Sequence, residues 1–135
     1  MSLQYSVSVR NAKLDAVETT IGTSAVLKIR TGSAPSDCSQ ADSGTVLATM
    51  SLPSDWMANA SSGSKAKSGT WNDTSADATG TAAHFRVYES TATTCHIQGT
   101  VTATGGGGDM TLDTTSITSG QTVTVTAFTL TAGNA

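Results

Sequence analysis

The run from Asp109 to Thr131 constrains the fold more than any other stretch of the chain. Between Gln121 and Thr126, valines alternate with threonines, and this period of two is typical of a half-buried β-strand. At Ala127-Phe128 the apolar phase slips by one residue, which predicts a β-bulge inside the strand. The sequence therefore predicts a sheet that includes one long, bulged strand near the end of the chain.

The composition also favours sheet. The 135 residues fit one domain, 1–135, and they include 25 Thr and 18 Ser, of which Thr is β-branched and suits strands. The formal net charge is −3 and the seven cations are scattered, so we expect no nucleic-acid partner. No apolar run approaches the roughly 18 residues of a membrane span, and we expect neither membrane insertion nor a cleaved export signal.

One helix is predicted, from Ser6 to Ile21. Ser6 or Ser8 can cap its start, and Gly22 stands where a left-handed cap is wanted. We expect this helix to cover one end or face of the sheet through a single apolar stripe. The stripe consists of Val7, Leu14, Val17 and Ile21.

The remainder, 25–131, is predicted to be an antiparallel β-sandwich or jelly roll of about seven or eight strands, so the fold class is all-β with one N-terminal helix. In the strand 82–89, alternation places His84, Arg86 and Tyr88 on the face opposite Phe85 and Val87. The predicted strands are Ala25–Thr31, Thr45–Leu52, an edge strand at Lys65–Trp71, Ala82–Glu89, Cys95–Thr104, Met110–Leu112 and Gln121–Thr131.

Two connecting segments carry expectations of their own. The glycines Gly105–Gly108 are followed by a strand rather than by Lys-Ser/Thr and a helix, so we expect a connector without stiffness and no phosphate site. Ser54 to Met57 is predicted to form one helical turn, in which Trp56 or Met57 plugs the edge of the core.

Cys38 and Cys95 are 57 positions apart. A bridge between them would contribute about 4 kcal/mol by the chain-entropy estimate. In a reducing cytosol they would remain free thiols, and we expect the free form.

We expect no catalytic residue, no cofactor and no metal ion. His84 and His96 lie on one predicted face but lack ligand spacing, and a surface pair is the simpler interpretation. Trp56 and Trp71 are expected to plug the core or its edge rather than to bind sugar. The aspartates of the loops show no calcium-loop spacing, and the serines show no nucleophile elbow.

Several stretches resemble a family of small proteins of tailed bacteriophages, which is similar to the jelly-roll cementing (decoration) proteins of HK97-like capsids. The resemblance rests on AVLKIRTGSAP, ADSGTVLATMSLP, TGTAAHFRVYES, TCHIQGTV and DMTLDTTSITSGQTVTVTAFTLTAGN. It implies a structural virion protein that is assembled in the bacterial cytoplasm, binds the major capsid protein or other virion subunits, and pairs as a dimer. It supplies no functional residue.

The expected function is therefore to bind and stabilise a capsid shell. The alternatives are a receptor- or glycan-binding module of a phage tail or fibre, another head–tail structural component, and a wall-degrading enzyme. The residues predicted to touch a partner are Lys65 and Lys67, with Trp71 as a candidate sugar contact. A homodimer or higher oligomer is expected because the long terminal strand would offer a pairing edge.

Overall fold

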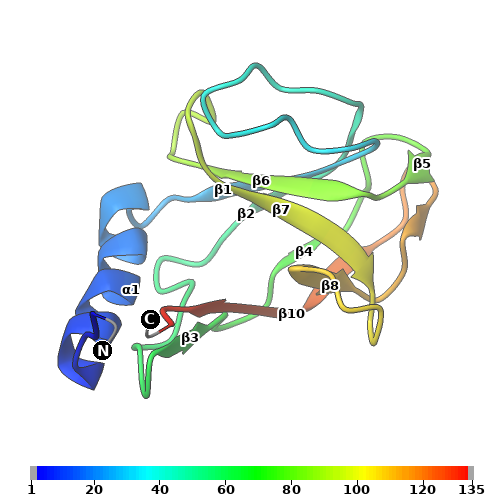
Figure 1. The fold of residues 1–135 in the computed structure, drawn as a ribbon. Coiled ribbons are helices and arrows are strands. Elements are labelled where there is room, and N and C mark those ends of the chain that lie inside the picture. Colours follow the sequence, from blue (N-terminus) through cyan, green and yellow to red (C-terminus); the bar gives the residue numbers. More distant parts are fainter. Residues whose placement is uncertain (1–2, 134–135) are drawn as a thin grey trace.

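The structure is a computed structural model that describes residues 3–133, and it consists mostly of β-sheet with one N-terminal helix (Figure 1). The predicted fold class is confirmed. The elements are α1 (Val7–Ile21), β1 (Val26–Arg30), β2 (Val46–Ser51), β3 (Ser64–Ala66), β4 (Asn72–Asp73), β5 (Gly80–Thr81), β6 (His84–Tyr88), β7 (Cys95–Ala103), β8 (Met110–Leu112), β9 (Ser116–Ile117) and β10 (Val123–Thr131).

The main sheet has eight strands and curls into a half-barrel. Its order is β2-β1-β6-β7-β8-β10-β3, and β4 pairs with β10 beside this path. In Figure 1, β2, β1, β6 and β7 form one layer, while β8, β10 and β3 lie across from it. β5 and β9 form a separate two-stranded ladder. The two layers enclose the core between them.

The core contains a row of aromatic rings. Trp56 and Trp71 have centroids 6.0 Å apart, Trp71 and Phe128 5.7 Å, and Phe85 and Phe128 5.4 Å. The indole Nε1 of Trp56 donates to the carbonyl oxygen of Gly22, 3.0 Å away, so the ring is buried without an orphaned donor. Trp56 and Trp71 are core residues, as predicted.

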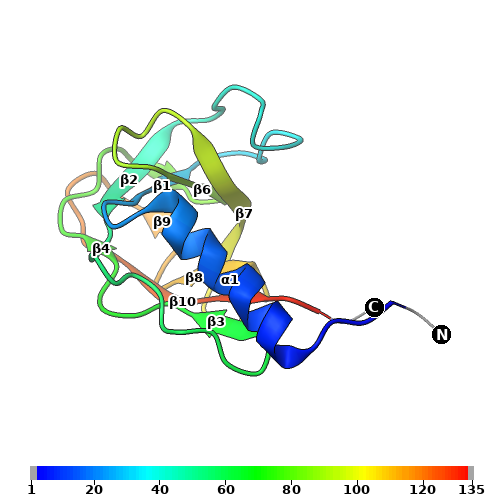
Figure 2. The ribbon, with the colours of Figure 1, turned by 90° about the vertical axis from the view of Figure 1, so that its left-hand side faces the viewer.

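Helix α1 closes the open side of the half-barrel, crossing from β7 toward β3 and β10 (Figure 2). The Ser6 side chain caps its start by accepting from the Val9 amide, and Gly22 follows its end at φ 96°. The predicted apolar stripe is only partly right. Leu14 and Ile21 are buried, whereas the side of the helix that carries Val7 faces solvent.

The terminal strand β10 has the predicted bulge, but it is not an edge. Its register against β8 shifts between Val125 and Ala127, where the sequence pattern placed the slip. β8 pairs with it on one side, while β4 and β3 pair with it on the other. The expectation that this strand leaves a long pairing edge is therefore wrong.

The connection from β7 to β8 differs from the prediction as well. The two strands run parallel, with Val101 opposite Met110, and only residues 104–109 join them. Parallel neighbours usually need a crossover of a dozen or more residues. Glycine allows this shorter one, since Gly105 and Gly107 have φ of 86° and 83°, and Gly108 packs on Thr102. The connector is a tight, bonded turn rather than a segment without stiffness.

Replacing Gly108 with alanine tests this tight turn. An added Cβ would lie 2.9 Å from the backbone nitrogen and from Cγ2 of Thr102, so the strand must shift. We expect Gly108→Ala to lower the free energy of unfolding by about 1–3 kcal/mol in urea titrations followed by circular dichroism. Gly133→Ala is the control, because a Cβ there meets open space. Equal stability of the two variants would contradict the packing argument.

Candidate interaction surface

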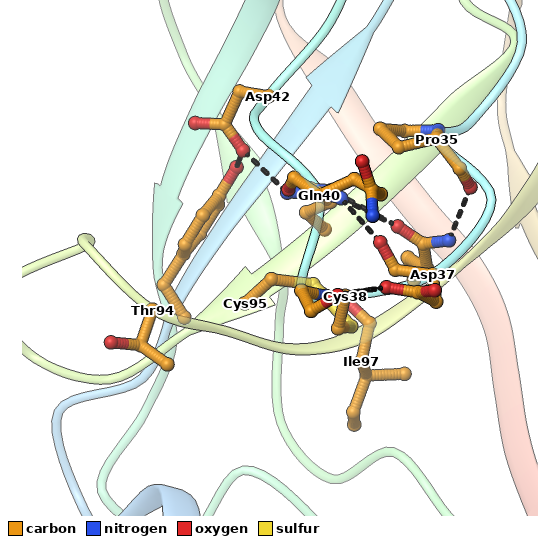
Figure 3. The surroundings of a disulfide bond; sticks show 12 residues. Pro35, Asp37, Cys38, Gln40, Asp42, Thr94, Cys95 and Ile97 are labelled. Carbon is orange, nitrogen blue, oxygen red and sulfur yellow. Dashed lines mark hydrogen bonds and ion pairs between the residues drawn. A yellow bond between two sulfur atoms is a disulfide. The ribbon is translucent and has the colours of Figure 1, made fainter.

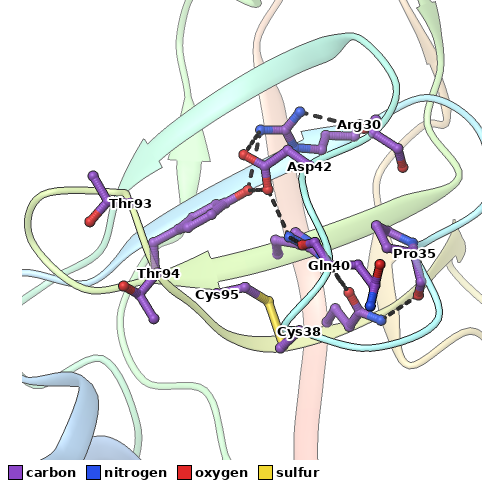
Figure 4. Close-up of polar contacts among 12 residues, drawn as sticks. Arg30, Pro35, Cys38, Gln40, Asp42, Thr93, Thr94 and Cys95 are labelled. Carbon is purple, nitrogen blue, oxygen red and sulfur yellow. Dashed lines mark hydrogen bonds and ion pairs between the residues drawn. A yellow bond between two sulfur atoms is a disulfide. The ribbon is translucent and has the colours of Figure 1, made fainter.

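The outer face of β6 is covered by the long loop between β1 and β2. All five residues of β6 are buried, although only Phe85 and Val87 point into the core cluster. The other three side chains, those of His84, Arg86 and Tyr88, were predicted to face outward. They do point away from the core, but residues 32–44 fold back over them (Figure 4).

Arg86 fastens this loop to the sheet. Its guanidinium is 2% exposed and donates to the carbonyl oxygens of Asp37 and Gln40 at 3.1 and 3.0 Å. It also donates to the Asp42 carboxylate at 2.8 Å and to the Gln98 side-chain oxygen. A buried charge is tolerated when it is paired and fully hydrogen-bonded, as it is here. Arg86 is therefore a structural clamp.

Asp42 joins two buried cations and a phenol. Arg30 donates to one of its carboxylate oxygens at 3.0 Å, and the Tyr88 hydroxyl donates to the other at 2.7 Å. Burial alone would raise the pKa of Asp42, but the bonds from Tyr88 and Arg86 and the charge of Arg30 outweigh it and lower the pKa. Burial raises the pKa of Tyr88, and its bond to Asp42 adds to this effect.

A disulfide between Cys38 and Cys95 joins the same loop to the start of β7, with the two Cα atoms 5.2 Å apart (Figure 3). The expectation of free thiols is therefore wrong for this structure. It came from assuming a reducing compartment, whereas the fold brings the two residues together because Cys95 pairs with Tyr88 beside the folded-back loop. Next to the disulfide is a hollow of about 310 Å³, bounded by Gln40, Arg86 and Thr94.

The lysines of the predicted contact set have different positions. The Lys65 side chain is 1% exposed, and its ammonium lies 2.7 Å from Asp15 and 3.0 Å from Glu18, both on α1. It also donates to the carbonyl oxygen of Ala58. Burial would lower the pKa of Lys65, but the hydrogen bonds to the two carboxylates raise it. Lys65 holds the helix and cannot touch a partner.

Of the other two predicted contacts, only Lys67 reaches the surface. Its ammonium donates to Gly69 and lies 5.9 Å from the centroid of the Trp71 ring. Trp71 itself is 1% exposed, so its ring offers no face to a sugar. Alternation alone cannot distinguish an edge lysine that faces solvent from one that faces a covering helix.

The two histidines do not form a surface pair. His84 is 1% exposed and its Nδ1 donates to the Gly32 carbonyl oxygen at 2.7 Å. His96 is exposed and belongs to the opposite end of the β6–β7 ladder, because His84 pairs with Thr100 while Tyr88 pairs with Cys95. Among residues 3–133, no group of three or more His, Cys, Asp or Glu side chains could hold a metal ion.

Several threonine side chains lie on the outer side of the β7–β8–β10 region, and we call this surface the threonine face. The Thr126 hydroxyl lies 2.8 Å from that of Thr104 and 2.7 Å from that of Thr111, so the three side chains fix one another. By alternation these positions lie opposite the buried Met110, Leu112 and Val125. The threonine face consists of Thr100, Thr104, Thr111, Thr124, Thr126 and Thr129.

The sequence contained a signal for the threonine face but not for the Arg86–Asp42 clamp. The threonine face follows from the alternation in β8 and β10, although its hydroxyl bonds do not. The Arg86–Asp42 clamp could have been suspected only from a charged residue in the middle of a strand, since Asp42 is 44 positions away in a loop.

Removing the disulfide should destabilise the folded chain. In the double variant Cys38→Ser/Cys95→Ser we expect the free energy of unfolding to fall by about 4 kcal/mol, because the unfolded chain regains the entropy of an open loop. Urea titrations with and without reductant measure this. Reduced wild-type protein should match the variant. Alkylation of both thiols in unreduced protein would contradict the disulfide.

Glu89 should contribute a pH-dependent part of stability. The backbone amides of Thr94 and Thr93 donate to its carboxylate at 2.8 Å and lower its pKa from 4.5 to about 2. A lowered pKa stabilises the fold above 4.5, and this contribution is lost as the pH falls toward 2. We therefore expect the stability difference between wild type and Glu89→Gln to shrink over that range in urea titrations.

Thr91→Val is the matched variant for this measurement. It removes the Thr91 hydroxyl bonds to Glu89 and to the Thr93 hydroxyl but keeps both amide bonds, and the Thr91 bond lowers the pKa of Glu89 less than the amide bonds do. It should keep most of the wild-type pH dependence. The same pH profile for Glu89→Gln and wild type would show that the carboxylate does not order this turn.

Within residues 3–133, no helix has both the length and the apolar character needed to cross a membrane. Compared with protein-family models, with curated proteins and with solved structures, the chain matches none.

Proposed function

We propose that this chain is a structural virion protein of a tailed bacteriophage, and that it cements a capsid by binding its subunits through the threonine face. The proposal joins the sequence resemblance to the surface that a partner would meet. Its location is the virion, after assembly in the bacterial cytoplasm, and the Cys38–Cys95 disulfide would form once lysis removes the reducing compartment. Its partner is the major capsid protein or a neighbouring virion subunit.

The observation that carries the proposal is the bonded arrangement of the threonine face. Thr104, Thr111 and Thr126 are held by hydroxyl–hydroxyl bonds of 2.7–2.8 Å, so their side-chain rotamers are fixed before a partner arrives. Ordering a flexible side chain on binding costs about 0.5–1.5 kcal/mol of free energy. These three side chains are ordered before binding, so part of that free-energy cost is avoided. A surface of fixed hydroxyl groups, bordered by the carboxylates of Asp109 and Asp113, suits a broad contact with another folded subunit.

The internal clamps support the same proposal, because they keep the sheet rigid under that face. Arg86 and the Cys38–Cys95 disulfide hold the loop on β6, and Lys65 holds α1. A protein that binds only the assembled shell stabilises the shell by mass action. On a lattice, copies that also bind one another gain avidity without a tight single site.

Capsids purified without the protein provide the test. The wild-type chain should co-sediment with them, and Thr126→Lys should weaken this binding by about tenfold or more, since a lysine desolvated in the contact costs more than a kilocalorie. Thr19→Lys is the control, because Thr19 is exposed on α1, away from the threonine face. Full binding by Thr126→Lys, or virions that contain no copy of the chain, would refute the proposal.

A glycan array tests the main alternative with the same two variants. The threonine face is expected to give no glycan signal at concentrations that saturate capsids. Glycan binding that Thr126→Lys abolishes, together with no capsid binding by the wild type, would favour a tail or fibre receptor module instead.

A further inference from the structure

His84 is a buried titratable residue with only one hydrogen-bond partner in the described chain. It is the first residue of β6, it is 1% exposed, and the loop of residues 32–44 folds back over its ring. Its Nδ1 donates to the carbonyl oxygen of Gly32 at 2.7 Å. Its Nε2 is also buried and forms no hydrogen bond with any group of the described residues. An orphaned nitrogen of this kind is uncommon in a protein interior, and its consequences can be worked out from the surrounding groups.

The bond to Gly32 fixes which ring nitrogen carries the proton. A carbonyl oxygen can only accept, so the proton of the neutral ring is on Nδ1 and the lone pair is on Nε2. A second proton would therefore bind to Nε2. The new N–H would be buried without an acceptor, and the ring would carry a buried positive charge. The closed loop accommodates the neutral ring but offers nothing to a second N–H.

Two cations share the outer face of the sheet with His84. Arg30 lies directly opposite it on β1, and Arg86 follows two positions later on β6. Like charges that lie opposite one another on neighbouring strands destabilise a sheet. The Nε of Arg30 is itself buried without an acceptor among the described residues. A positive imidazole would be a third cation in a place that already lacks acceptors.

The carboxylates of the surrounding elements already have other partners. In the loop, Asp42 accepts from two arginines and a tyrosine, and Asp37 accepts from the amide and hydroxyl of the residue two positions later. On β7, the residue opposite His84 is Thr100, whose hydroxyl donates to Asp109. Within the described chain, no carboxylate forms a hydrogen bond with the imidazole.

The loop carboxylates keep their charge at pH values where an imidazole takes up a proton. An imidazole ordinarily does so near pH 6.5 (about), whereas a guanidinium stays charged throughout. Hydrogen bonds from the hydroxyl and amide of Ser39 lower the pKa of Asp37. Burial alone would raise the pKa of Asp42, but its bonds to Tyr88 and Arg86 outweigh burial and lower it. Acid therefore reaches this site through the histidine before it reaches the clamp.

We propose that acid opens the first part of the loop of residues 32–44, with His84 as the group that binds the proton. The neutral ring holds Gly32 on β6. The protonated ring leaves its buried position for water, where Nε2 finds an acceptor, and its bond to Gly32 is lost. One bound proton shifts the ratio of open to closed loop by up to about tenfold for each pH unit below about 6.5.

The clamp and the disulfide limit how far the loop opens. Arg86 donates to the carbonyl oxygen of Asp37, and the disulfide follows at the next residue, so the opening segment is residues 32–36. Within this segment, the carbonyl oxygen of Pro35 accepts from the Gln98 side chain at 2.6 Å, and this bond must break as well. The opening does not depend on the capsid role, and the isolated chain is enough to test it.

Limited proteolysis of the full chain with a protease of broad specificity tests the opening from about pH 7.5 to about 5.5. The rate of cleavage within residues 32–36, divided by the rate for a peptide of the same sequence, follows the open fraction. It should rise by up to about tenfold per pH unit in the wild type. In His84→Asn, whose side-chain amide can still donate to Gly32 but binds no proton, the rate should not change with pH. His96→Asn removes the other, exposed histidine and should behave as the wild type.

NMR of the wild-type chain tests the same coupling without relying on a variant that must fold. Long-range proton–nitrogen spectra at neutral pH should show His84 with its proton on Nδ1. On acidification, the ring of His84 and the amides of residues 32–36 should change with one common midpoint, whereas His96 should titrate without them.

Three outcomes would overturn the proposal. The first is a protonated His84 while residues 32–36 stay closed, and the second is wild-type cleavage that does not change with pH. The third is the same pH dependence in His84→Asn as in the wild type, with circular dichroism showing that the variant is folded.

Discussion

The buried guanidinium of Arg86 is the contact on which the outer layer of this protein depends. It makes five hydrogen bonds, to the loop at Asp37, Gln40 and Asp42 and to Gln98 on β7. A charge taken out of water destabilises a fold unless its partners replace the lost hydration. Because all of them come from segments outside β6, the arginine ties strand, loop and neighbouring strand into one unit.

The same device holds the helix. Lys65 is buried against Asp15 and Glu18 of α1, so an ammonium fixes the helix on β3 in addition to its buried Leu14 and Ile21. Carboxylates elsewhere also bind within the chain, as Glu89 does with the amides of its own turn. With few aromatic residues available, the fold combines a small ring cluster with buried ion pairs and a disulfide.

The use of charges inside the molecule explains the character of the surfaces that remain. The threonine face is held in part by its own hydroxyl bonds, as Thr111 and Thr126 illustrate, and in part by the Asp109 carboxylate, which accepts from Thr100. Leu3, Tyr5, Val7 and Val9, at the start of the chain, expose apolar side chains. The threonine face suits contact with a broad, folded neighbour.

Local order allowed part of this to be predicted from the sequence. The alternation in β10, its bulge at Ala127, the Ser6 cap and the core position of Trp56 all depend on residues within a few positions of one another. The threonine face follows from the same alternation. Neighbouring side chains set these features, so the sequence by itself determined them.

Tertiary structure alone decided the rest, because it depends on which distant segments meet. Lys65 is buried because α1 brings two carboxylates over it, and Arg86 because a loop 44 positions away folds back. Cys38 reaches Cys95 for the same reason. The glycines before Asp109 form a tight crossover because Thr102 packs under them. No periodic pattern in the sequence indicates these long-range contacts, since each forms only when the whole chain folds and buries its core.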